Sequence, residues 1–180
     1  MNVPDSHSQV KRDADAKRAT RARDGFRIAV VAVVAMTVMT LFYIYLAFHY
    51  GGWQLFALVA NAAVLTLALL ASAVLIRRGR VELGMGLFLG AMQVTFVINS
   101  ALVAGEGWAL ASAALLTLVI APQTLTARQS SLAMVTGVFA GVAALLVDVF
   151  ELPHRLPAPE PLRVVVPIVI AAVVLILYRL

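Results

Sequence analysis

Six long stretches of this chain are almost free of charged residues. They cover residues 28–48, 53–76, 83–105, 107–127, 129–148 and 163–180. About 20 consecutive apolar residues are enough to cross a bilayer as a helix. Hydrophobic residues make up 62% of the chain and charged residues 13%, whereas a soluble domain carries roughly half and a quarter. The pattern predicts an all-α integral membrane protein, with six transmembrane helices in three hairpins.

The basic residues divide unevenly between the two ends of these spans. Of the 14 Lys and Arg residues, seven precede the first span, three follow the second in RRGR, one follows the fourth and one lies at the end of the sixth. Only Arg155 and Arg163 fall at the opposite ends of the spans. The positive-inside rule therefore predicts cytoplasmic termini in a multi-pass protein of the cell (inner) membrane.

Residues 1–27 form a basic segment ahead of the membrane domain, which comprises residues 28–180. The segment contains KRDADAKRATRARDGFR, in which acidic residues are mixed with the basic ones. Aromatic side chains do not alternate with the charges, so nothing favours nucleic-acid binding. The expected partner is the lipid bilayer, whose anionic lipids attract such cytoplasmic segments.

Two of the spans carry the motif Gly-x-x-x-Gly, as GLFLG and GVFAG. The motifs and the amide on the same helix face are Gly86, Gly90, Gln93, Gly137 and Gly141. In lipid this spacing lets two helix backbones approach closely, because van der Waals contact drives the association of membrane helices. We therefore expect close helix contacts at these residues, either within one bundle or between the copies of a homodimer.

Amide side chains also lie inside the spans. They are Asn61, Gln93 and Asn99, and Asn99 lies one helical turn from Thr95. Such groups form hydrogen bonds between membrane helices. We expect Thr95 and Asn99 to form a small polar patch of this kind.

The third outer connection carries four residues that we expect at a polar rim. They are Asp148, Glu151, Arg155 and Arg163. Water reaches this edge of the membrane, so we expect Asp148 to pair with Arg155 or Arg163, or to cap the rim. Four prolines between Pro153 and Pro161 favour an extended conformation for this connection.

The sequence carries no motif for catalysis or cofactor binding. It has no cysteine, and its three histidines lie far apart, so no metal site is expected. It has no phosphate-binding loop, nucleophile elbow or zinc motif. We expect no metal, no cofactor and no catalytic residue in this chain. Pro122 and Pro167 are expected to kink the fourth and sixth spans.

Three segments in order, RRGRVELGMGLFLG, LLTLVIAPQTLTARQS and LLVDVFELPHRLPAPEPLR, precede a last apolar span. This arrangement, over about residues 77–180, resembles the multi-span N-terminal membrane module of bacterial signalling proteins. The resemblance implies a cytoplasmic output domain of the GAF, histidine kinase or nucleotide cyclase type. It assigns no functional residue.

Three functions stay open on these observations. The leading hypothesis is a sensory or anchoring module that transmits a signal to a cytoplasmic output domain beyond Leu180, because the last span is short and ends abruptly. The second is a structural or assembly subunit of a larger membrane complex. The third is a small transporter. This hypothesis has less support, because no charged residue lies in the middle of a span.

Overall fold

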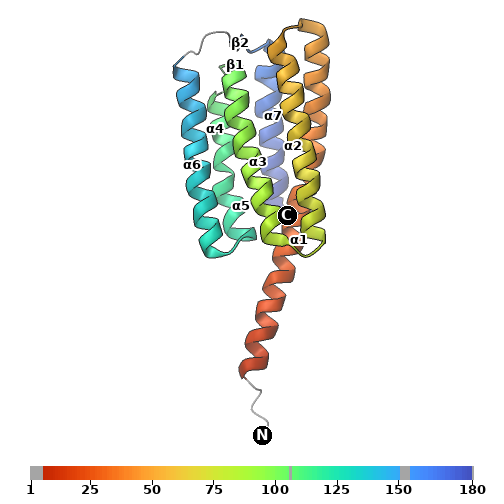
Figure 1. Cartoon of the computed structure of the whole chain (residues 1–180), viewed down its shortest axis with the longest axis vertical. Coiled ribbons are helices and arrows are strands. Elements are labelled where there is room, and N and C mark those ends of the chain that lie inside the picture. The colour runs from red at the N-terminus through yellow and green to blue at the C-terminus, as the bar shows by residue number, and fades with distance from the viewer. Residues whose placement is uncertain (1–5, 106, 151–154, 180) are drawn as a thin grey trace.

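The computed structural model describes the backbone of residues 6–105, 107–150 and 155–179, and most of it is helical. The helices run up and down in one bundle, with α4 and α5 stacked end to end as one segment (Figure 1). The elements are α1 (Ser6–Tyr50), α2 (Trp53–Arg77), α3 (Val81–Leu102), β1 (Val103–Ala104), α4 (Gly107–Leu115), α5 (Thr117–Thr124), α6 (Ala127–Val149), β2 (Leu156–Pro157) and α7 (Glu160–Arg179).

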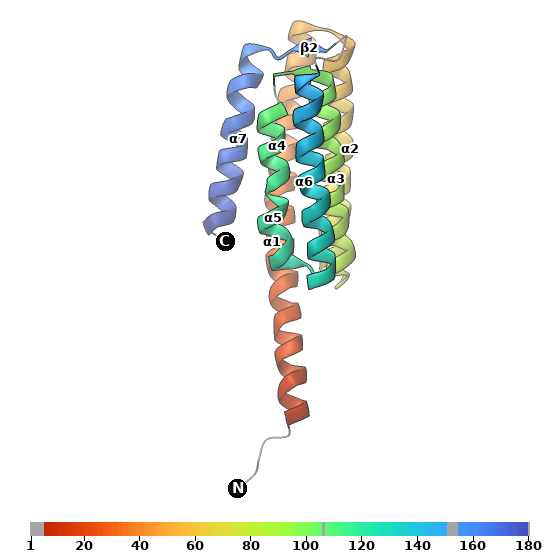
Figure 2. The same ribbon diagram turned by 90° about the vertical axis from the view of Figure 1, so that its left-hand side faces the viewer.

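Helix α1 is much longer than the bundle is tall. It runs without interruption for 45 residues, and its N-terminal part projects beyond the other helices (Figure 1). The C-terminal end of α7 lies at the same end of the bundle as this projection (Figure 2). The two ends of the described chain therefore share one side of the molecule.

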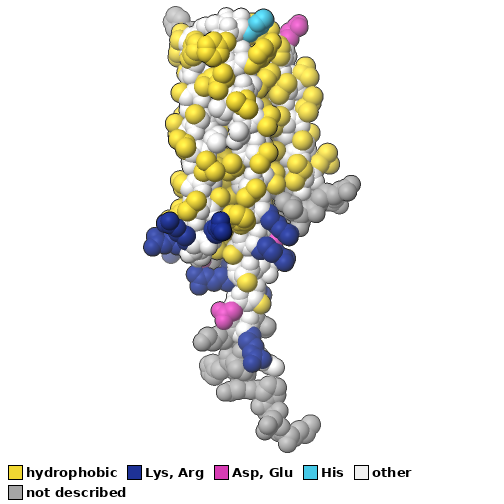
Figure 3. Space-filling view, turned by 90° about the vertical axis from the view of Figure 1, so that its right-hand side faces the viewer, with side chains coloured by type: hydrophobic (Ala, Val, Ile, Leu, Met, Phe, Trp, Pro, Cys, Tyr) yellow, Lys and Arg dark blue, Asp and Glu magenta, His cyan; other side chains and the backbone are white. Residues whose placement is uncertain are grey.

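Four helices among the described residues are long and apolar enough to cross a membrane. They are the Ala14–Tyr50 part of α1, α2, α3 and α6. Their outward faces carry large apolar side chains, such as Leu67, Leu132 and Phe139, each about two-thirds exposed or more. In Figure 3 this apolar surface ends where Lys and Arg side chains gather, at the end from which α1 projects. An apolar exterior above a basic band indicates a membrane-embedded protein.

The fourth apolar stretch is two helices rather than one. The break falls at Leu116, whose N–H donates to the Ala113 carbonyl three residues back instead of four. The neighbouring Thr117 hydroxyl donates to the Ala114 carbonyl at 2.7 Å, and such local bonds compete with regular helical bonding. The break therefore comes before Pro122, the residue at which the sequence predicted a kink.

The connection between α6 and α7 is extended only in part among its described residues. Leu156 and Pro157 form β2, which pairs in parallel with β1 so that Val103 lies opposite Leu156. Helix α7 already begins at Glu160, before the predicted start of the last span at residue 163. Proline is tolerated in the first turn of a helix because the N–H groups there need no helical acceptor, and Pro161 occupies such a position.

Gly86 and Gly90 form no close helix contact within the bundle, so that alternative of the prediction is wrong and a contact between copies stays a prediction. Both glycines are exposed, and a Cβ added at either would meet no atom within 4 Å. The glycine of α3 that allows a close approach is Gly84, where a Cβ would lie 2.6 Å from Cγ1 of Ile76. The Ser72 hydroxyl of α2 donates to the Gly84 carbonyl at 2.7 Å, and this bond turns the opposite side of α3 outward.

The glycines of α6 face the bundle interior. A Cβ on Gly137 would lie 2.9 Å from Cβ of Thr117, so this position requires the absence of a side chain. At Gly141 the nearest atom would be the Ala111 carbonyl oxygen at 3.5 Å, an ordinary van der Waals distance. Helix α6 therefore packs closely against the α4–α5 segment, most tightly at Gly137.

Candidate functional site

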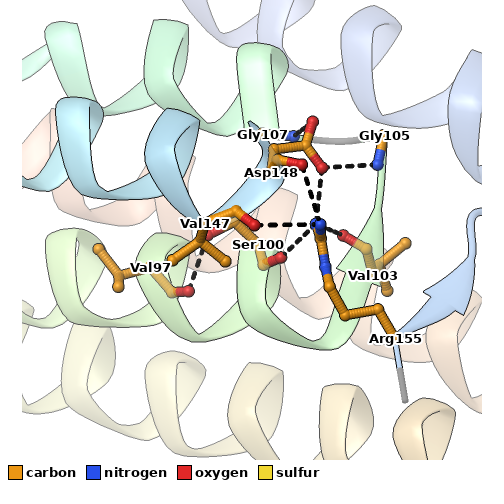
Figure 4. A network of polar contacts seen from close by, with 8 residues as sticks. All are labelled: Val97, Ser100, Val103, Gly105, Gly107, Val147, Asp148 and Arg155. Carbon is orange, nitrogen blue, oxygen red and sulfur yellow. Dashed lines mark hydrogen bonds and ion pairs between the residues drawn. The ribbon is translucent and has the colours of Figure 1, made fainter. Parts of the chain in front are cut away.

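The side chain of Arg155 lies where four elements meet, at the end of the bundle opposite the projecting part of α1. It enters from the residue preceding β2, and only 4% of it is exposed (Figure 4). Its Nη2 donates to Asp148 Oδ1, to the Ser100 carbonyl and to the Val103 carbonyl, each at 2.6 Å. A buried guanidinium is stable only when its charge and its donors are matched in this way.

The carbonyls that receive Arg155 lie at the C-terminal ends of two helices. Ser100 lies in the last turn of α3 and Val103 directly follows that helix, while Val147 and Asp148 lie in the last turn of α6 and accept from Nη1 at 3.2 and 3.4 Å. The last carbonyls of a helix have no helical donor and carry partial negative charge. One guanidinium therefore caps two helices that are adjacent in space and far apart in sequence.

The carboxylate of Asp148 joins this network to the start of α4. Its Oδ1 accepts from the Gly105 N–H at 2.8 Å, and its Oδ2 accepts from the Gly107 N–H at 3.3 Å. Gly105 has φ of +85°, which favours glycine, and a Cβ on Gly107 would lie 2.5 Å from Cβ of Asp148. The two glycines allow the backbone to wrap around the carboxylate.

One donor of the network has no acceptor. Nε of Arg155 is buried and forms no hydrogen bond within the described residues. An unpaired buried donor costs about 1–3 kcal/mol. Nη1 and Nη2 of the guanidinium therefore have acceptors, whereas its Nε has none within the described residues.

Of the other predicted rim residues, Arg163 does not join this network. The sequence left Asp148 free to pair with Arg155 or Arg163, and the structure pairs it with Arg155. Arg163 is exposed on α7 and forms no ion pair within the described part of the chain. Glu151 lies outside the described residues.

Two amide contacts tie helices together deeper in the bundle. Asn61 of α2 donates from Nδ2 to Asn99 Oδ1 at 2.7 Å and to the Thr95 carbonyl at 3.3 Å, both on α3. Gln93 donates from Nε2 to the Ala133 carbonyl of α6 at 3.2 Å. The patch expected of Thr95 and Asn99 thus includes Asn61, which sequence spacing gave no reason to add.

An apolar cavity of about 90 Å³ lies between α7 and the rest of the bundle. Its walls come mainly from α1, α3, the α4–α5 segment and α7, with Tyr43, Thr95 and Asn99 among the few polar side chains. The α7 wall consists of Val166, Val169, Ile170 and Val173. Well-packed interiors leave few such voids, so the contact of α7 with the bundle is looser than the contacts among the other helices.

Within the described residues, no group of three or more His, Asp and Glu side chains could hold a metal ion. The geometry instead defines a class: a helical membrane protein with a buried polar network at one end of the bundle. We call this network the Arg155 clasp; it consists of Arg155, Asp148 and the backbone groups that these two side chains bind. Comparison of the chain with protein-family models, curated proteins and solved structures finds no match. The resemblance to signalling modules therefore rests on the sequence pattern alone.

Proposed function

We propose that this chain is a sensory or anchoring module that crosses the bacterial inner membrane six times, with both termini in the cytoplasm. The signal leaves the module as a change in the position of α7, which is passed to a cytoplasmic output domain. The observation that carries this proposal is the uneven attachment of α7. The helix is held firmly at its outer end and loosely toward its cytoplasmic end.

At the outer end, three side chains fix α7 and the strand before it. Ala158, Leu162 and Val166 are each less than a tenth exposed, and β2 pairs with β1 beside the Arg155 clasp. Beyond Val166, every described side chain of α7 is half-buried or exposed. Figure 2 shows α7 at the edge of the bundle, inclined away from α5 toward its C-terminal end.

Pro167 lies at the boundary between the two parts of α7. Proline has no N–H to donate to the carbonyl four residues earlier, so the helix is weakest there. A two-state transmitter needs only a few kcal/mol between its states. A proline beside a cavity, at the end of the anchored turns, supports a small movement of this kind.

The module is proposed to act as a homodimer through the outer face of α7. Val164, Ile168, Ala171 and Leu175 are all exposed, and they follow one another at steps of four, three and four residues. This is the spacing with which two parallel helices pack side by side. The assembly-subunit hypothesis uses the same surface with a different partner, whereas a transporter gains no support from the clasp.

Distance measurements between spin labels test the movement. Because the chain has no cysteine, labels can be placed at Leu83 and Leu175, with Leu83 and Leu132 as the control pair on helices that pack closely. In lipid nanodiscs we expect a broad distance distribution for the Leu83–Leu175 pair, and its mean distance should change in Arg155→Gln. The distance distribution of the control pair should be narrow and should not change. A narrow distance distribution for the Leu83–Leu175 pair that is unchanged in Arg155→Gln would contradict signal transmission through α7 and favour the hypothesis of an assembly subunit.

A further inference from the structure

A basic concavity lies where α1 leaves the bundle. It has a volume of about 630 Å³ and is formed by the projecting part of α1, the α2–α3 turn with the start of α3, and the end of α5. Four cationic side chains line it: Lys17, Arg18, Arg21 and Arg80. We propose that this concavity binds the phosphate-bearing headgroup of an anionic phospholipid.

The cations of α1 share one face of the helix. Lys17, Arg18 and Arg21 follow Ala14 at three, four and seven residues, the spacing that brings side chains to one side. Arg12 and Arg23 lie on the opposite side of the same helix by the same periodicity. The charged residues that α1 contributes to the lining of the concavity are therefore all cations.

These cations have no partner in the described part of the chain. The ion pairs found there are Arg23–Asp24 and Asp148–Arg155, and neither involves the concavity. Among the described residues that line the concavity, Glu82 is the one acidic residue, and its carboxylate accepts from the Gln129 amide of α6 at 3.2 Å. Within the described residues, four positive charges without an ion-pair partner therefore surround one hollow and repel one another, and an anion placed between them lowers that repulsion.

The position of the hollow favours a lipid over a soluble phosphate compound. Figure 3 shows the Lys and Arg side chains gathered directly below the apolar exterior, which is where basic residues lie when an apolar exterior is embedded in a membrane. Leu83 lines the concavity and is 59% exposed, so it continues the wall into the apolar zone. A headgroup can therefore lie among the cations while its acyl chains follow the outer face of α3. This site does not depend on any movement of α7.

Lipid retention measures this binding. The full chain would be reconstituted in nanodiscs of equimolar phosphatidylcholine and phosphatidylglycerol, and the lipids that remain bound would be identified by native mass spectrometry. We expect the wild-type chain to retain phosphatidylglycerol preferentially. The double substitution Arg18→Gln/Arg21→Gln should reduce that preference about tenfold or more, since each basic residue near an anionic surface adds to the binding free energy.

The matched control is Arg12→Gln/Arg23→Gln, which removes the same charge from the other side of α1 and should retain the wild-type preference. An equal loss in both variants would show diffuse attraction and overturn the site. Inorganic phosphate and a nucleoside triphosphate, titrated into the same nanodiscs of phosphatidylcholine and phosphatidylglycerol, form the second arm. If either binds the wild-type chain and displaces phosphatidylglycerol, the occupant is a soluble phosphate compound and the lipid assignment fails.

Discussion

Nη2 of Arg155 lies 2.6 Å from Oδ1 of Asp148, and the same nitrogen donates to carbonyls that end α3. The ion pair is local in sequence, but the carbonyls of Ser100 and Val103 are 55 and 52 residues away. The contact therefore joins two hairpins of the bundle at the point from which α7 departs. Its strength decides how firmly the outer end of α7 is held.

Arg155→Gln should destabilise the protein by about 3 kcal/mol, because removing one partner of a buried ion pair leaves the other charge and several carbonyls unpaired. The measurement is reversible unfolding in mixed micelles, followed by circular dichroism. Arg163→Gln is the control, because this exposed arginine has no ion-pair partner in the described residues and should change stability by less than about 0.5 kcal/mol. Equal effects of the two substitutions would show that the clasp adds nothing to stability.

Two glycines of α3, two residues apart, should respond in opposite ways to alanine. A Cβ at Gly84 would lie 2.9 Å from the Ser72 carbonyl oxygen as well as close to Ile76, so Gly84→Ala should cost about 1–3 kcal/mol by overpacking. Gly86 has open space around it, and Gly86→Ala should be neutral or stabilise the helix by up to about 1 kcal/mol. The same unfolding measurement compares them. If Gly86→Ala were the more damaging change, Gly86 would lie at an interface with another chain.

The glycines show what the sequence could and could not predict. Long uncharged stretches predict membrane helices, because the bilayer imposes its thickness on any chain that crosses it. The spacing of Gly86 and Gly90 places them on one face of α3 without saying which neighbour that face meets. The contact of Ser72 with Gly84 fixes the rotation of α3, and it depends on the turn between α2 and α3. Gly84 lies two residues before the GLFLG motif, and no pattern in the sequence distinguishes it as the position of a close contact.

The polar rim is a second case in which the sequence predicted one contact and not another. The charges of Asp148 and Arg155, seven residues apart at the edge of the membrane, were enough to suggest a pair. Nothing in the sequence indicates that the guanidinium also caps α3, because that requires the ends of α3 and α6 to lie side by side. The basic concavity was equally hidden, since it forms only when α1 continues as a straight helix past the α2–α3 turn.

The amide pair of Asn61 and Asn99 should contribute a small coupling energy between α2 and α3. Hydrogen bonds between membrane helices are worth about 0.6 kcal/mol on average and at most about 1.7 kcal/mol. A double-mutant cycle with Asn61→Ala and Asn99→Ala should give a coupling in this range, with Thr40 and Asn99, which share no hydrogen bond in the structure, as the control cycle. A coupling of zero would mean that water or lipid satisfies both amides equally well.

The proposed topology predicts where reporters will lie. Fusions after Arg80, Arg128 and Leu180 should all give cytoplasmic signals, because the basic band lies at that end of the bundle. A fusion after Gly51, in the turn between α1 and α2 at the opposite end, should give a periplasmic signal. A periplasmic signal at Arg80 or Arg128 would reverse the orientation and remove the lipid site from the cytoplasmic leaflet.

Cross-linking tests the homodimer on the outer face of α7. Ile168 and Leu175 are 60% and 65% exposed, and they lie on the stripe whose spacing suits a second α7. Single cysteines at these positions should form disulfide-linked dimers in native membranes under mild oxidation, because two parallel helices in contact bring equivalent residues together. Val64, 64% exposed on α2, is the control for a side chain that faces lipid, and a cysteine there should cross-link far less. The cysteine-free sequence makes each product unambiguous. If Ile168→Cys and Leu175→Cys cross-link no faster than Val64→Cys, α7 faces lipid and any signal must be transmitted by a single copy of the module.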